Sequence, residues 1–334
     1  MIAALTRCTL LALAMFSPTA ICAPIKLKLA FNTSDRSDLY LGSVKSFVDA
    51  VNEEADGLIE IDVYFSGVLA GIPPQPQLLL NGVADLAVIP SGQWQVRFPD
   101  DSVLELPGLF HDAREATLVY SRLVRAHALR GYEDFFAIGA FSSGPGSIHS
   151  RKRLTSLSDL KGMKIGARSA TEAAVLERLG AVSDELALPQ AVEAISAGRI
   201  DGAAAPLAMF SYFGIGRITT YHYLIPISAA PLAVLMNRNK FDSLPERAQG
   251  IIRKHSGKPM AARFIAHWQD LEKSELERIK SNERRTVTVP SPIDGAAAQA
   301  MFRSVNDEWA GASARNFELL SLVKKELARI RATQ

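Results

Sequence analysis

Apolar and polar residues follow two different rhythms in the first part of the chain. Over 25–31 they alternate, which predicts a strand with one buried face. Over 41–55 the apolar residues recur at helical spacing, and Asp56–Gly57 ends that helix. The next expected elements are a strand over 58–65, a short helix over 75–81 and a buried strand over 85–89. This β-α-β-α-β order is typical of a parallel sheet in an α/β fold.

A second unit of the same kind follows later in the chain. Gly82 and Gly198 each end an expected helix, and Asp85 and Asp201 each stand three residues later, before a small apolar strand. An aspartate at this point can accept hydrogen bonds from the backbone of the turn. We therefore interpret both aspartates as structural and treat a ligand role as the minority alternative. The elements of this second unit are expected at 163–167 and 200–204 for the strands, and at 171–179 and 190–197 for the helices.

Two similar α/β units in one chain predict two lobes with a ligand-binding cleft between them. A strand over 232–237 is expected to return to the first lobe, and a long helical region from 242 through 280 is expected to bridge both lobes. Helices over 294–331 end the chain. The expected lobes, each a mixed, mostly parallel sheet flanked by helices, comprise 24–143 with 231–271 for lobe I, and 144–230 with 272–334 for lobe II.

Residues 1–23 have the pattern of a secretory signal peptide. Arg7 provides a positive start, an apolar run follows over 9–16, and small residues precede a cleavage site after Cys22 or Ala23. Both cysteines of the chain, Cys8 and Cys22, lie in this segment, so the mature chain is expected to be cysteine-free. No later apolar run is long enough to cross a membrane, so we expect a soluble, exported protein.

Composition excludes several other classes of protein. The 37 basic and 35 acidic residues leave a net charge of +2 and form no dominant block, which argues against a nucleic-acid-coating surface. The six histidines form no paired metal motif, and neither a nucleophile elbow nor a phosphate-binding loop is present. We therefore expect no metal and no cofactor. An enzyme with a dispersed active site stays the weaker alternative.

Six segments carry a family pattern in the same order and spacing: Asp56–Tyr64, Leu104–Phe110, Leu157–Ile165, Glu193–Gly202 with Pro206, Phe241–Glu246 and Asp307–Trp309. Together they resemble the solute-binding proteins of TRAP (tripartite ATP-independent periplasmic) transporters, of the DctP type that binds C4-dicarboxylates or sialic acid. The resemblance implies a two-lobed periplasmic-binding-protein-like fold whose lobes close on a small organic acid. It also implies a periplasmic, non-enzymatic receptor that delivers its ligand to TRAP membrane permease subunits, and we take a monomer as the default. A receptor that hands its closed form to a membrane sensor is the alternative.

The expected ligand anchors depart from the family pattern. A carboxylate buried in a cleft needs a hydrogen-bonded cation, and the planar guanidinium of arginine suits it. The resemblance implies an arginine at Gly166, an asparagine at Ala205 and a second arginine near Gly146. Arg168 lies two residues beyond Gly166 on the same strand face and is the candidate replacement. The alternative is that Arg168 pairs with Glu172 outside the cleft.

Further candidates for the cleft come from residues near strand ends. His149 lies beside the missing upstream arginine, and Asn32 follows the first strand. Trp94, Tyr212 and Phe213 follow later strands and would give large contact areas to a ligand. Core packing is the alternative for each aromatic residue. Because polar anchors are missing, we expect a ligand that is less acidic or more aromatic than is usual for the family.

Overall fold

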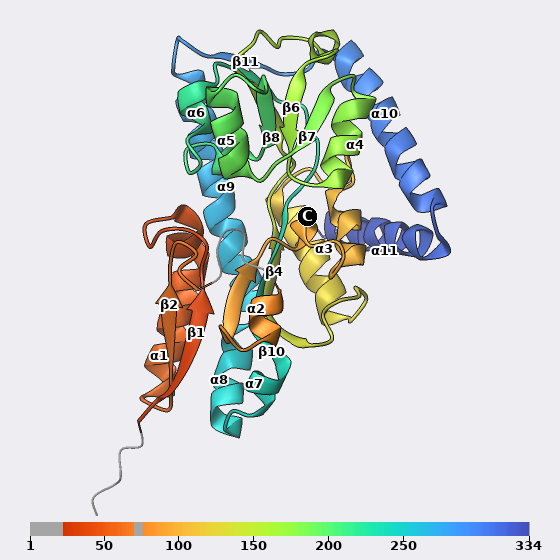
Figure 1. Ribbon diagram of the computed structural model, residues 1–334. Helices are drawn as coiled ribbons and strands as arrows, with labels where there is room; N and C mark the ends of the chain where they lie inside the picture. The colour runs from red at the N-terminus through yellow and green to blue at the C-terminus, as the bar shows by residue number, and fades with distance from the viewer. Residues whose placement is uncertain (1–22, 70–75, 334) are drawn as a thin grey trace, which may run out of the picture.

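The computed structural model describes residues 23–69 and 76–333 of the chain. Apart from Ala23, the expected signal peptide lies outside the described residues, so its cleavage site stays a prediction. The described chain forms two lobes, one above the other in Figure 1, and each lobe is built around one β-sheet. The described residues contain no helix that is both long enough and apolar enough to cross a membrane.

The first lobe contains a five-stranded sheet in the order β2-β1-β3-β10-β4. Strands β1, β2 and β3 are parallel, and β10 runs antiparallel to both of its neighbours, β3 and β4. The apolar residues of β1 that the alternation predicted, Leu27 and Leu29, are fully buried. The strands are β1 (Ile25–Ala30), β2 (Ile59–Tyr64), β3 (Leu86–Ile89), β4 (Phe135–Ser142) and β10 (Pro231–Asn237).

Helices cover both faces of this sheet and create a hydrophobic core on each side. The first long helix shows the reason, because Phe47, Val48 and Val51 recur at helical spacing and are buried against the sheet. The third helix begins at Asp112, whose carboxylate accepts a hydrogen bond from the Glu115 amide at 2.8 Å. The helices are α1 (Lys45–Ala55, preceded by a π turn at Tyr40–Val44), α2 (Gln77–Leu80), α3 (Ala113–Arg125), α7 (Arg238–Asp242) and α8 (Glu246–His255).

The second lobe contains a six-stranded sheet in the order β11-β9-β5-β8-β6-β7. Here β5 is the strand that runs antiparallel to its neighbours, as β10 does in the first lobe, so both sheets are mixed and mostly parallel. The strands are β5 (Ser147–Ser150), β6 (Lys164–Ala167), β7 (Val182–Glu185), β8 (Gly202–Ala205), β9 (Tyr221–Tyr223) and β11 (Thr286–Thr288). Its shorter helices are α4 (Ala170–Arg178), α5 (Leu188–Ser196) and α6 (Ile215–Ile218).

The repeated glycine-to-aspartate segment has the same structural role in both lobes. The Asp85 carboxylate accepts a hydrogen bond from the Lys28 amide of β1 at 2.8 Å. The Asp201 carboxylate accepts one from the Lys164 amide of β6 at 3.0 Å. Each aspartate therefore ties the start of its strand to the neighbouring parallel strand, which supports the structural interpretation of both.

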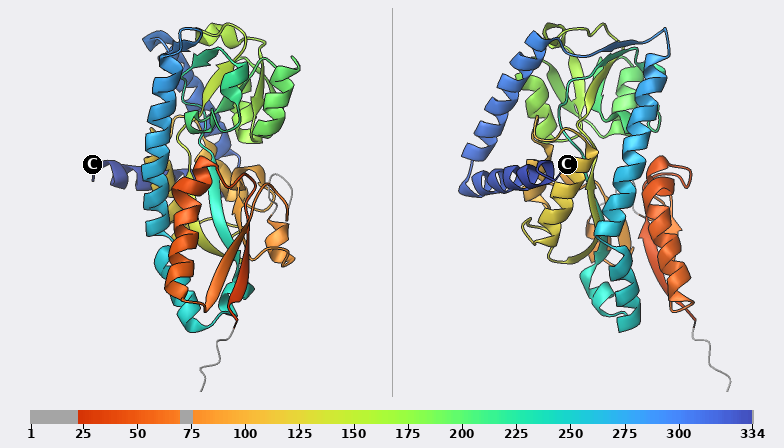
Figure 2. Two further views of the ribbon diagram at one scale, coloured as in Figure 1. Left: turned by 90° about the vertical axis from the view of Figure 1, so that its left-hand side faces the viewer. Right: turned by 180° about the vertical axis from the view of Figure 1, so that it is seen from behind.

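Before the C-terminal helices, three stretches of chain lead from one lobe to the other: 142–147, 223–231 and the helix α9 (Lys258–Lys280). The first two are hydrogen-bonded to each other, because the Ser143 amide donates to Ala230 O at 3.1 Å and the Gly146 amide donates to Ser228 O at 2.9 Å. Figure 2 shows α9 running along the molecule from the first lobe into the second, which confirms the expected bridging helix.

The helical region expected from 242 through 280 is not continuous. It consists of α7, α8 and α9, and the break before α9 lies at Ser256–Gly257. Gly257 has a φ of +67°, and its amide donates to Ile138 O of β4 at 2.7 Å. A side chain is strained at this positive φ, so glycine permits the turn that docks the start of α9 against the first-lobe sheet.

The last two helices, α10 (Pro292–Gly311) and α11 (Ala314–Arg331), pack against different lobes. Ala298 and Phe302 of α10 join a second-lobe core cluster. Leu320, Val323 and Leu327 of α11 join a first-lobe core cluster, and α11 lies beside α3 (Figure 1). The assignment of all of 272–334 to lobe II is therefore wrong for α11, because its apolar side is buried against the first lobe.

Candidate ligand-binding cleft

A cavity of about 100 Å³ lies between the two lobes. Residues of the first lobe, of the second lobe and of α9 all contribute to its wall, so it is the cleft that the two-lobed fold predicts. Its lining residues are Asn32, Thr33, Asp38, Leu39, Val88, Pro90, Gly92, Gln93, Glu105, Arg168, Ala187, Leu188, Pro189, Ala208, Met209, Tyr212, Phe213, Ala230, Pro231, Leu232, Trp268 and Leu271.

Arg168 is the one basic residue in the described part of this wall. Its guanidinium forms an ion pair with Glu172, in which Nε donates to Oε2 at 3.2 Å and Nη2 donates to Oε1. Nη2 also donates to the carbonyl oxygen and the hydroxyl of Ser228, each at 3.3 Å. The side chain of Glu172 is fully buried and that of Arg168 is 7% exposed, so the pair is held in a medium of low dielectric constant.

The local sequence explains why Arg168 and Glu172 meet. Ser169 is the N-cap of α4, and its hydroxyl accepts a hydrogen bond from the Glu172 amide at 3.2 Å. The Glu172 carboxylate turns back over the same helix end and accepts from the Arg168 amide at 2.7 Å. Serine followed three residues later by glutamate is the sequence of a capping box, and it fixes both charged groups at the start of α4.

Glu105 brings a second buried carboxyl group to the cavity. It is 4% exposed, and Gln95 Nε2 donates to its Oε2 at 3.4 Å. Burial raises the pKa of Glu105 to about 8, although the positive charge of Arg168 opposes that rise. Gly92 makes room for this carboxyl group, because a Cβ at residue 92 would lie 2.4 Å from Glu105 Oε1.

The remaining wall is mostly apolar. Tyr212 and Phe213 lie edge to face with their ring centroids 4.6 Å apart. Trp268 of α9 is anchored because its indole nitrogen donates to Glu272 Oε1 at 3.1 Å, and Leu271 lies one turn further on. Apolar walls with a few convergent polar groups are the usual composition of a small-molecule site.

Four of the residues expected at the site line this cavity: Asn32, Arg168, Tyr212 and Phe213. The two interpretations of Arg168 were separate in the sequence, and the structure combines them, because Arg168 pairs with Glu172 and also faces the cavity. A binding role for these four side chains stays a prediction.

The other four expected residues lie outside the wall of the cavity. Trp94 packs against the first-lobe core. Gly166 faces α5, where an added Cβ would lie 3.2 Å from Ala191 Cβ, so an arginine would not fit there without rearrangement. Ala205 is fully buried in a second-lobe core cluster with Phe210.

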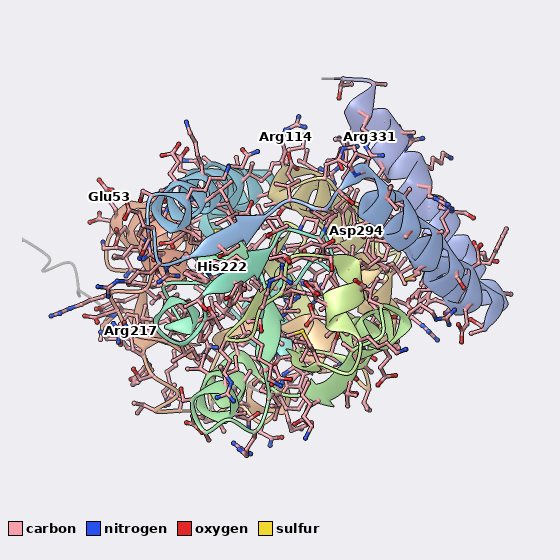
Figure 3. The ribbon with its side chains drawn as sticks, turned by 90° about the horizontal axis from the view of Figure 1, so that it is seen from above. Glu53, Arg114, Arg217, His222, Asp294 and Arg331 are labelled. Atoms are coloured by element: carbon pink, nitrogen blue, oxygen red, sulfur yellow. The ribbon has the colours of Figure 1, made fainter. Side chains whose placement is uncertain are left out.

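His149 is also placed inside the second lobe and not at the cleft. Its Nδ1 lies 3.0 Å from Nδ1 of His222, and its Nε2 lies 3.2 Å from Ala205 O. Burial lowers the pKa of His149 to about 4 and that of His222 to about 3, so both rings are neutral at pH 7. Seen from above, His222 lies towards the middle of the lobe, whereas Arg217 lies nearer its edge (Figure 3).

The sequence interpretation missed Glu105, Trp268 and Leu271. Glu105 lies in the segment Leu104–Phe110, where a single acid is surrounded by apolar residues, and this was the available signal. Trp268 and Leu271 lie three residues apart on the long helix, and nothing in this helical spacing indicates which part of an apolar stripe faces a cavity. The described residues contain no group of three or more His, Cys, Asp or Glu side chains suited to a metal ion.

Comparison with known proteins confirms the resemblance to TRAP solute-binding proteins. A curated solute-binding protein of Verminephrobacter eiseniae is 22% identical over 232 residues, which span 68% of this chain and 69% of that protein. A TRAP solute-binding protein of Rhodoferax ferrireducens in complex with benzoate has a TM-score of 0.86 at 22% identity, over 92% of this chain and 99% of that one.

A second structure, a marine metagenome TRAP solute-binding protein specific for aromatic acid ligands, has a TM-score of 0.84 at 24% identity, over 91% of this chain and 99% of that one. At these identities the two structures show the shared fold. The family profile described as "Bacterial extracellular solute-binding protein, family 7" matches residues 30–312. This match spans most of the chain, and the protein therefore belongs to family 7 of the bacterial extracellular solute-binding proteins.

Proposed function

We propose that this protein is a periplasmic receptor that captures a small organic carboxylate in the cleft between its lobes and delivers it to a TRAP permease. Membership in a family of solute-binding proteins assigns the cleft to ligand capture and not to catalysis. The observation that carries the proposal is the placement of Arg168, a cation almost enclosed in a mostly apolar cavity to which both lobes contribute.

The chemistry of this arrangement favours an anionic ligand. An arginine in a dry cavity can hold a carboxylate through charge-assisted hydrogen bonds, which are stronger there than in water. The apolar wall would exclude water around that contact once the lobes close. Similar structures contain benzoate, mandelate or orotic acid, which are organic acids of comparable size, and this supports the same class of ligand here.

A thermal-shift screen of the purified chain from residue 23 tests the capture step. The panel contains monocarboxylates, dicarboxylates, sugar acids and neutral solutes, and an acid at 100 times its Kd should add about 2.7 kcal/mol of stability. The shift should disappear in Arg168→Met and persist in Arg153→Met, because Arg153 is 71% exposed and absent from the cavity wall. Stabilisation by neutral solutes alone would contradict the proposal.

Delivery to a permease needs a separate test. Bacteria that lack the gene should lose uptake of the identified acid, and uptake should return when the full chain is expressed. A strain that keeps full uptake but loses its transcriptional response to the same acid would identify the protein as part of a sensor system.

A further inference from the structure

The charges around the cavity are unusual for a site that binds an acid. The described wall contains one basic residue, Arg168, and two acidic residues, Asp38 and Glu105. Directly behind the wall, Glu172 neutralises Arg168 with a fully buried carboxylate. The protein itself therefore places three carboxyl groups at or directly behind the wall, against one cation.

Only part of the Arg168 guanidinium is available to a ligand. Nε and Nη2 donate to Glu172, and Nη2 also donates to Ser228. Among the described residues, Nη1 has no hydrogen-bond partner. Its two N–H groups can donate to one carboxylate. A second carboxylate on the same ligand would find no other basic side chain in the described wall.

The acidic residues of the wall act differently on an incoming anion. Glu105 lines the same cavity as Arg168 and is buried, which raises its pKa to about 8. Its carboxyl group is therefore mostly protonated at pH 7, and the O–H can donate a hydrogen bond to a ligand carboxylate held by Arg168. Asp38 is only partly buried, and its carboxylate lies where it opposes a second carboxylate on the first-lobe side of the cavity. One ligand charge is therefore accommodated and a second is opposed.

The rest of the wall fits an apolar ligand body. Aromatic side chains approach from two sides, with Tyr212 and Phe213 on the second lobe and Trp268 on α9. Leu188 and Pro189 at the start of α5 face Leu39 and Leu232 of the first lobe across the cavity. Flat aromatic groups gain large contact areas against such walls.

We infer that the cleft selects a monocarboxylate with a flat apolar body and discriminates against dicarboxylates of the same shape, because Arg168 is the single cation of the described wall and already has Glu172 as a partner. The inference rests on the proposed capture of an organic acid and adds the class of acid. It concerns the second charge of a ligand, so it can fail while the proposed function holds.

Isothermal titration calorimetry with three ring compounds tests the inference on the full mature chain. Benzoate has one carboxylate, isophthalate has two, and 3-carbamoylbenzoate replaces the second carboxylate by a neutral amide of similar size. We expect 3-carbamoylbenzoate to bind about tenfold or more tightly than isophthalate, since the two differ mainly in one charge. Equal binding of these two compounds, or tighter binding of isophthalate, would overturn the inference.

Variants of the acidic residue and of the ion pair sharpen the test. Asp38→Asn removes a charge that opposes the second carboxylate and should reduce the preference by about threefold or more. Arg168→Met should abolish binding of all three compounds, and Arg153→Met should change none. If isophthalate binds more tightly and this binding depends on Arg168, the monocarboxylate inference fails and the proposed function stands. If no carboxylate of the wider screen binds, the proposed function fails as well.

Discussion

Buried carboxylates occur in two regions of this protein, and their partners differ. On the side of the first lobe that α11 covers, here called its back, Asp100 accepts hydrogen bonds from two arginines, Arg130 and Arg315, at 2.7 and 2.6 Å. In the cleft the ratio is reversed, because one arginine, Arg168, lies beside Glu172 and Glu105. The charge of Asp100 is balanced by two arginines and needs no ligand. Arg168 faces a cavity and keeps Nη1 without a hydrogen-bond partner among the described residues, so it can bind a ligand carboxylate.

The pKa values follow the same difference. Burial alone would raise the pKa of Asp100, but hydrogen bonds from Arg130 and Arg315 outweigh it and hold this pKa below its usual value. Burial dominates at Glu105 and raises its pKa to about 8. The comparison shows that the buried charge of Asp100 is satisfied within the first lobe, whereas the cleft keeps donor capacity for the ligand that we propose.

The largest expected effect comes from breaking the cleft pair. Arg168→Met leaves the Glu172 carboxylate buried without a cation, which should cost about 3–5 kcal/mol of unfolding free energy in urea titrations. Because such a loss could itself prevent binding, the double variant Arg168→Met/Glu172→Gln is the control. It should recover part of the stability, since no buried charge remains, but none of the binding. Recovery of acid binding in the double variant would contradict a role for Arg168 as the anchor.

A change at the back of the first lobe tests the placement of α11. Leu327 is 3% exposed within the first-lobe core, so Leu327→Ala should cost about 2–5 kcal/mol. Hydrogen exchange should become faster in α3 and in the neighbouring first-lobe strands. Phe317→Ala is the matched control, because Phe317 lies on the same helix and is 64% exposed. Faster exchange confined to the second lobe would show that α11 does not stabilise the first.

The pH dependence of ligand binding should follow the raised pKa of Glu105 and not the lowered pKa of Asp100. The charged groups that act on Glu105 are Arg168, Glu172 and Asp101. Ionisation of Glu105 removes a hydrogen-bond donor and adds a negative charge, so benzoate affinity should fall by up to about tenfold per unit as the pH rises above about 8. Glu105→Gln cannot ionise and should make the affinity independent of pH between 7 and 9.

The same residue affects stability with a defined sign. The folded-state pKa of Glu105 is raised above the unfolded value, so the folded chain binds more protons between the two. Stability contributed by the protonated group is therefore lost as the pH rises from the unfolded pKa towards about 8. Glu105→Gln should remove this slope from unfolding curves of the unliganded protein. An unchanged slope would show that Glu105 is already ionised in the folded chain.

The smallest effect is expected for one arginine at the back of the first lobe. Arg315→Met leaves Asp100 paired with Arg130, and the Arg315 side chain is 37% exposed. The cost should be about 1 kcal/mol or less, because solvent screens the interaction and one cation remains. Urea titration measures it, and ligand affinity should be unchanged. A loss as large as that of Arg168→Met would end the distinction between the two regions.

Sequence patterns were sufficient for the elements that lie near the start of the first lobe. The alternation in Ile25–Ala30 and the helical spacing in Lys45–Ala55 depend on local burial, and both elements form as expected. The break at Gly257 was missed because the docking of the Gly257 amide on Ile138 is a tertiary contact. The position of α11 was missed for a related reason, since its apolar stripe fits either lobe until the chain path is known.

The sequence likewise predicted some residues of the candidate site and misplaced others. A strand-end position led to Asn32, and the two-residue spacing from Gly166 led to Arg168; both line the cavity. Family spacing led to Gly166 and Ala205, but these positions face packed side chains of the second lobe. Strand parity gives the face of a sheet and not what covers that face, so parity alone could not separate Gly166 from Arg168.

The helices α10 and α11 link the two lobes in addition to the connecting stretches and α9. Arg178 of α4 donates to Ser304 of α10 at 2.7 Å, while Asn306 of the same helix donates to Pro107 O of the first lobe at 3.0 Å. Beyond the turn at Ala312–Ser313, α11 is fixed to α3. The two helices are therefore held to both lobes by these contacts. Under the proposed function, a rotation that opens the cleft would strain these contacts, so the C-terminal helices would add to the free energy needed to release a ligand.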